Sequence, residues 1–110
     1  MRRINPYILL LLLSFSVLPL QGQKLDSLLR VLNSYKKDDS GKLSLLNQVS
    51  KQYEFSNIPL GLQTADTAIA LGKKINDSTG LASAYMTKGQ LLYANGNYSK
   101  ALELYQISLE

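Results

Sequence analysis

The chain has 110 residues and carries 12 Lys and Arg against 8 Asp and Glu, which gives a net charge of +4. It contains no Cys, His or Trp. These absences exclude a disulfide scaffold, a zinc site built on Cys or His, and catalysis by a thiolate or an imidazole. Apolar residues make up 45% of the chain, so its composition is not that of a disordered protein.

The positive charge is not distributed as in a nucleic-acid-binding protein. Arg2 and Arg3 supply half of the net charge, and from Gln23 onward there are 10 basic and 8 acidic residues. A net charge of +2 over that part does not provide a basic groove for phosphates. No nucleic-acid partner is therefore expected for this segment.

The first 22 residues have the organisation of a secretory signal peptide. Two arginines precede an uncharged apolar run over residues 7–20, Pro19 breaks the run, and Gly22 is a small residue at the expected cleavage position. The run is shorter than the roughly 20 apolar residues of a membrane-spanning helix, although an uncleaved N-terminal anchor is the alternative. We expect a mature chain that begins near Gln23, is exported to the periplasm or the extracellular space, and engages the membrane only transiently.

Apolar residues recur with helical spacing in the rest of the chain. Leu25, Leu28, Leu29 and Leu32, for example, lie on one face of a helix. Clusters of Asp, Asn, Ser, Gly and Pro separate the periodic segments, and no segment alternates as a strand would. The pattern predicts helices over residues 25–36, 42–55, 59–75, 79–94 and 98–110. Short links between them favour antiparallel hairpins, and Gly96 is expected to adopt a positive φ in the last turn.

A spaced set of large and small residues spans the last two predicted helices. Tyr85 and Gly89 lie in the first, and Ala101 and Tyr105 lie in the second. This arrangement resembles the tetratricopeptide repeat (TPR), a pattern of about 34 residues with Trp, Gly, Ala and Phe at these places. Small residues suit the positions where two helices approach, and large residues fill the space between them. Lys88 departs from the Leu of the family pattern.

A weaker copy of the pattern lies upstream. Tyr53 precedes Leu92 by 39 residues, and Gly61 precedes Ala101 by 40. This spacing exceeds the usual length of about 34 residues, so the copy is interpreted as a divergent repeat. The structural positions that the resemblance assigns are Tyr53, Gly61, Ala68, Tyr85, Gly89, Tyr98, Ala101 and Tyr105.

The resemblance implies an all-α fold of antiparallel helix-turn-helix repeats, a TPR-like α-solenoid fragment that follows a signal peptide. The expected order is a signal peptide (1–22), a lead helix and loop (23–41), a divergent repeat (42–80) and a repeat cut off before its final turn (81–110). The last predicted helix carries apolar residues with no capping helix after it. Because solenoids normally end in a polar cap, we expect the chain to be the N-terminal part of a longer protein.

Protein or peptide binding is the function that the resemblance implies, on the concave side lined by the first helix of each pair. Binding residues expected there are Asn47, Lys51, Glu54, Met86, Gln90 and Tyr93. The alternative for each is an ordinary solvated helix face. An alternative function is the extracytoplasmic sensor region of a membrane-bound histidine kinase, cyclase or transcriptional regulator, with its output domain downstream.

No catalytic site, metal site or cofactor is expected. Asp38 and Asp39 are adjacent acids in a turn, where such residues usually act as solvated caps; a small enzyme built on them is the remaining alternative. The segment 39–43 lacks the first Gly and the hydroxyl of a phosphate-binding loop. Segments 76–78 and 97–99 match the glycosylation sequon, but turn and cap residues are expected at both places.

Overall fold

The computed structural model describes residues 17–109, so most of the predicted signal peptide lies outside the described residues. The described part is all-α, as predicted, and its five α-helices pack in an antiparallel manner. The elements in chain order are α2 (Val17–Ser34), α3 (Ser40–Gln52), a short 3-10 helix η1 (Tyr53–Phe55), α4 (Ile58–Ile75), α5 (Ser78–Ala94) and α6 (Tyr98–Leu109).

Side-chain caps begin four of these helices. Each capping side chain accepts a hydrogen bond from the backbone N–H three residues along the chain: Asp39 before α3 (3.1 Å), Asn57 before α4 (3.2 Å), Asp77 before α5 (3.0 Å) and Asn97 before α6 (3.4 Å). Each cap satisfies a helix N–H that would otherwise lack a partner. Two turns end helices with positive φ, at Asn76 (56°) and at Gly96 (86°). The positive φ of Gly96 agrees with the prediction, whereas that of Asn76 was not anticipated.

The helix boundaries agree with the predicted ones to within a few residues, except at α2. That helix includes Val17, whereas the predicted helix starts at residue 25, and it ends at Ser34, two residues before the predicted end. In the loop after α2, the Tyr35 hydroxyl donates a hydrogen bond to the Asp39 carboxylate at 2.7 Å. The predicted helix 42–55 is divided, since its last three residues form η1.

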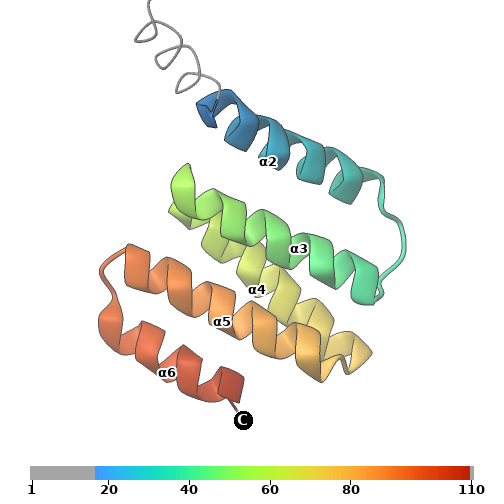
Figure 1. Cartoon of the computed structure of the whole chain (residues 1–110). Coiled ribbons are helices and arrows are strands. Elements are labelled where there is room, and N and C mark those ends of the chain that lie inside the picture. The colour runs from blue at the N-terminus through green and yellow to red at the C-terminus, as the bar shows by residue number, and fades with distance from the viewer. Residues whose placement is uncertain (1–16, 110) are drawn as a thin grey trace, which may run out of the picture.

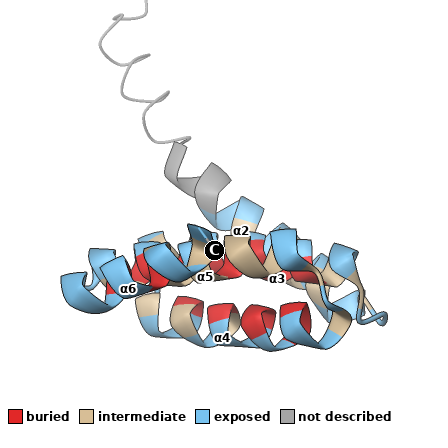
Figure 2. Ribbon diagram, turned by 90° about the horizontal axis from the view of Figure 1, so that it is seen from below, coloured by how far each residue is buried: buried red, intermediate tan, exposed pale blue. Residues whose placement is uncertain are grey.

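The helices form two layers, and α4 alone makes up one of them. Figure 1 shows α3 and α5 side by side with α4 behind them, and Figure 2 shows α4 in a layer of its own. Each of α3, α4 and α5 packs against the next helix in the chain, and α3 also contacts α5 directly. Because α4 connects them, α3 and α5 run in the same direction.

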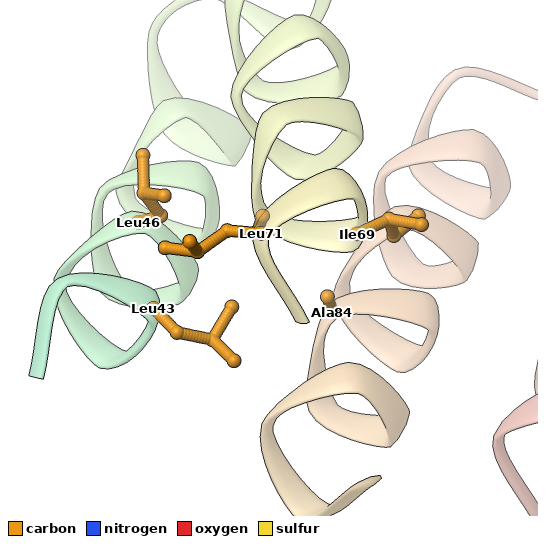
Figure 3. Close-up of a cluster of buried hydrophobic side chains, with 6 residues drawn as sticks. Leu43, Leu46, Ile69, Leu71 and Ala84 are labelled. Carbon is orange, nitrogen blue, oxygen red and sulfur yellow. The ribbon is translucent and has the colours of Figure 1, made fainter. Parts of the chain in front are cut away.

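The core lies where α3, α4 and α5 meet. Leu43 and Leu46 from α3, Ile69 and Leu71 from α4, and Ala84 from α5 are buried together (Figure 3). Leu32 of α2 and Tyr85 of α5 pack against this cluster from its edges. Burial of these side chains supplies the main driving force for the association of the three helices.

Candidate functional site

A groove runs between α3 and α5, the first helices of the two hairpins. Its volume is about 420 Å³. Its floor contains the buried side chain of Leu43 and the backbone of Gly80. Most of the side chains that line the groove are polar; they include Ser44, Asn47, Gln48, Lys51, Thr79 and Ser83.

Gly80 allows α5 to approach α3 closely. A Cβ atom at Gly80 would overlap with the side chain of Leu43. Asn47 then joins the two helices, because its Nδ2 donates a hydrogen bond to the Gly80 carbonyl oxygen at 3.2 Å. The floor of the groove is therefore a tight helix–helix contact rather than an opening into the core.

The two charged groups of the groove differ in their partners. Asp77 caps α5, and the hydrogen bonds from the Gly80 backbone N–H and the Ser40 side chain lower the pKa of its carboxyl from the usual value. Lys51 is exposed and has no ion-pair partner among the described residues. One unpaired positive charge is thus available at the rim of the groove.

The two adjacent acids after α2 are held in a network that fixes the loop. Asp38 pairs with Lys74 at 2.8 Å and with Lys42 at 3.0 Å, and these ammonium groups lower the pKa of its carboxyl. The hydrogen bond from Tyr35 and the backbone N–H of Lys42 lower the pKa of Asp39 in the same way. Since Lys74 lies on α4, the network ties the loop to two helices.

The structure brings two of the six expected binding residues to the groove. Asn47 is buried, with 7% of its surface exposed, and Lys51 is exposed. Glu54 lies in η1 beside a separate pocket of about 400 Å³ at the α3–α4 connection. The other three, Met86, Gln90 and Tyr93, are exposed on α5, outside the residues that line the groove.

An exposed aromatic pair lies at the turn between α5 and α6. The ring centroids of Tyr93 and Tyr98 are 4.9 Å apart, with an angle of 64° between the planes. This edge-to-face geometry is favourable for aromatic rings. Both side chains are about 60% exposed (59% and 61%), so the pair adds apolar surface beside the end of α5.

The expected structural positions differ in burial. Gly61, Ala68, Gly89 and Ala101 are buried, Tyr53, Tyr85 and Tyr105 are half-buried, and Tyr98 is exposed. A Cβ at Gly89 would lie 2.8 Å from the Tyr105 ring and 3.3 Å from the Ala101 carbonyl oxygen. The small and large residues of this hairpin therefore do contact each other.

Ser50 is a further small residue at a helix–helix contact, and the sequence analysis did not identify it. Ser50 is fully buried, and its Oγ donates a hydrogen bond to the Gly61 carbonyl oxygen at 2.8 Å. It precedes Gly89 by 39 residues, which is also the spacing between Tyr53 and Leu92. This spacing could have identified Ser50 as the counterpart of Gly89, but a single Ser in a helical pattern does not indicate a helix–helix contact by itself.

Within residues 17–109, no group of three or more Asp, Glu, His or Cys residues could hold a metal ion. In the same range, no helix combines the length and the apolar content needed to cross a membrane.

Comparison with known proteins gave no relatives. A scan against protein-family models, a search of curated proteins and a search of solved structures each found no match.

Proposed function

We propose that this chain is an exported TPR-like scaffold that binds a protein or peptide on the surface formed by α3 and α5. The groove between these two helices is the observation that carries the proposal. The proposal has two parts, namely that the hairpins are equivalent repeats and that their first helices form the binding surface.

Equivalent contacts within the two hairpins support the first part. Ser50 reaches the Gly61 carbonyl oxygen between α3 and α4, and the Gly89 Cβ position faces the Ala101 carbonyl oxygen between α5 and α6. The residues of these two contacts are separated by 39 and 40 positions. In both hairpins a small residue of the first helix meets the backbone of a small residue of the second.

The stacking of the hairpins also fits a solenoid. The helix α5 packs against both α3 and α4, so the second hairpin begins by covering the first (Figure 1). Repeat proteins bury their apolar faces in this way, each repeat against its neighbour. Figure 2 shows α3 and α5 in one layer, together with α6, while α4 forms the other layer.

Two apolar residues of α6 are more exposed than the residues 40 positions earlier in α4. Leu102 and Leu109 are 61% and 83% exposed, whereas Leu62 and Ile69, each 40 residues earlier, are half-buried and buried. Ile69 lies in the core cluster together with residues of α5.

Selection from a pool of random dodecapeptides displayed on phage, against the immobilised chain, tests the proposal. We expect Lys51→Ala and Ser83→Ala, at two residues that line the groove, to weaken binding of the selected peptides by about tenfold each, which corresponds to the loss of one good polar contact. The matched controls Gln63→Ala and Lys73→Ala alter exposed residues of α4 and should leave the affinity unchanged. Failure to select any binder, or equal effects of the α4 controls, would contradict the proposal.

A further inference from the structure

In the part of the chain that the structure describes, the most exposed aromatic side chains gather at one end of the helical layers. They are Phe55, Tyr93 and Tyr98, with 71%, 59% and 61% of their surface exposed. Phe55 ends η1, in the connection between α3 and α4, whereas Tyr93 and Tyr98 flank the turn between α5 and α6 (Figure 1). Asn95 of that turn lines the same pocket as residues 54–59, so the two connections lie side by side. We call this end of the molecule the aromatic end.

The aromatic end and the opposite end differ in charge. Residues 53–59 contain one charged residue, and residues 93–98 contain none. The two connections at the opposite end, residues 35–39 and 73–77, contain four and three charged residues, and an ion pair joins them. The aromatic end is therefore apolar and nearly uncharged, while the opposite end is suited to water.

The apolar N-terminal run of the chain joins the described helices at the aromatic end. Residues 7–20 carry no charge, and α2 includes the last of them. The helix α2 packs antiparallel on α3 (Figure 1), so the start of α2 lies beside the end of α3, from which η1 continues. A signal peptide or an uncleaved anchor engages the membrane through such a run. That engagement would bring the aromatic end, and not the charged end, toward the bilayer.

We propose that the aromatic end docks on a membrane surface, with the rings of Phe55, Tyr93 and Tyr98 in the interfacial region of the bilayer. Tyr suits this region because its ring is apolar while its hydroxyl stays hydrated. The rings of Tyr93 and Tyr98 contact each other with a centroid distance of 4.9 Å, so they enter the interface together. Because this end has almost no charge, burial of the rings rather than ion pairing provides the attraction.

Docking by the aromatic end leaves the proposed peptide-binding groove open. The groove is lined by residues from the beginning of α5, such as Thr79 and Ser83, whereas the aromatic end lies where α5 ends. Membrane docking and peptide binding therefore use different parts of the molecule, and the inference does not depend on the proposed function.

Quenching of a fluorophore by brominated lipid tests the inference in the full chain. The chain has no Cys, so a single introduced thiol can be labelled specifically with nitrobenzoxadiazole. Ser56→Cys places the label at the aromatic end, and Ser78→Cys places it at the opposite end; both residues are exposed. In vesicles of phosphatidylcholine brominated on its acyl chains, we expect strong quenching at residue 56 and none at residue 78. High salt should leave the quenching unchanged, because charges do not provide the attraction.

Removal of the three rings separates their effect from that of the N-terminal run. The combined substitutions Phe55→Ser, Tyr93→Ser and Tyr98→Ser should reduce the quenching at residue 56 to the level at residue 78. Circular dichroism checks that the helices are retained, as expected for side chains that are mostly exposed. A matched control, which should keep the wild-type quenching, replaces by Ser three exposed apolar residues away from the aromatic end: Val31, Ile107 and Leu109.

Two results would overturn the inference. The first is an absence of quenching at residue 56 in the wild type, and the second is undiminished quenching in the variant without the three rings. A blue-shifted emission at residue 56 that brominated lipid does not quench would show that a protein, such as a second copy of the chain, covers this end instead. None of these results bears on the selection of peptides, so the proposed function stands or falls separately.

Discussion

The Oγ of Ser50 donates a hydrogen bond to the carbonyl oxygen of Gly61 at 2.8 Å, across the interface between α3 and α4. Ser50 has no exposed surface, and a Cβ at Gly61 would lie 3.2 Å from the Ser50 backbone oxygen. The two helices are therefore as close here as their backbones allow. The contact between Gly89 and Ala101 plays the same part in the second hairpin.

Enlarging Ser50 should separate α3 from α4. Ser50→Leu adds volume where none is free and removes the hydrogen bond to Gly61, so we expect a loss of about 1–3 kcal/mol in the free energy of unfolding. Urea denaturation followed by circular dichroism measures it. The neighbouring exposed residue supplies the control, since Gln48→Leu should change the free energy by less than about 0.5 kcal/mol. Equal effects of the two substitutions would argue against the close contact.

The second hairpin should respond in the same way at Ala101. This residue is 1% exposed, and its carbonyl oxygen lies 3.3 Å from the Gly89 Cβ position. We expect Ala101→Leu to overpack the interface of α5 and α6 and to lower the free energy of unfolding by about 1–3 kcal/mol. Thermal denaturation of this variant, compared with that of Lys100→Leu at the exposed neighbouring position, measures the effect. An unchanged midpoint for Ala101→Leu would contradict the packing of this hairpin.

Asn57 should stabilise the fold by capping the start of α4. Its side chain accepts a hydrogen bond from the Leu60 backbone N–H at 3.2 Å at the start of α4. Replacing an Asn cap by Ala typically costs about 1 kcal/mol, so Asn57→Ala should lower the unfolding free energy by about that amount. Asn33→Ala removes an exposed Asn from α2 and serves as the control. A cap without structural importance would give the same small change in both variants.

Stability should fall in acid because three carboxyl groups have lowered pKa values. Hydrogen bonds and ion pairs hold the pKa of Asp38, Asp39 and Asp77 below the usual 3.8 in the folded state. Their contribution is complete above that value and is lost as the pH falls through the folded-state pKa values. Urea midpoints measured from neutral to strongly acidic pH should show this decline, and Asp39→Asn should make it shallower. An identical pH profile for Asp39→Asn would be the contrary result.

Tyr35 should make the stability of the fold decrease at basic pH, in contrast to the three carboxyl groups, which do so at acidic pH. The hydrogen bond to Asp39 and burial raise the pKa of its phenol above the usual 10.0. The neutral phenol is therefore favoured in the folded state, and its stabilising contribution should be lost as the pH rises through the raised pKa. Spectroscopic titration of the tyrosinate band should show one late-titrating Tyr that is absent from Tyr35→Phe. A titration identical in both proteins would show that the hydrogen bond to Asp39 is not formed.

The helices could be predicted from the sequence because most of the interactions that set their ends are formed between residues close together in the chain. The cap residues Asp39, Asn57 and Asp77, and the positive φ of Gly96, depend on neighbours within a few positions. The end of α2 at Ser34 was placed two residues too late, since apolar periodicity gives the end of a helix only to within one or two residues.

The groove could not be predicted in the same way, because residues far apart in the chain form it. Asn47 and Gly80 are 33 positions apart, and their hydrogen bond exists only once α5 has packed on α3. On a helical pattern, Asn47 looks like an ordinary exposed polar residue, whereas the structure buries it. Ser50 was missed for the same reason, since its role depends on the approach of α4.

The most direct test of the account is the location of a bound peptide on the two layers of helices. Backbone amide NMR shifts of the chain should be recorded with and without a dodecapeptide selected from the random pool. The account predicts that the largest shift changes fall on α3 and α5, at Lys51 and Ser83 in the groove, and that α4 residues such as Gln63 and Lys73 change little. Changes concentrated on α4, or absent altogether, would contradict it.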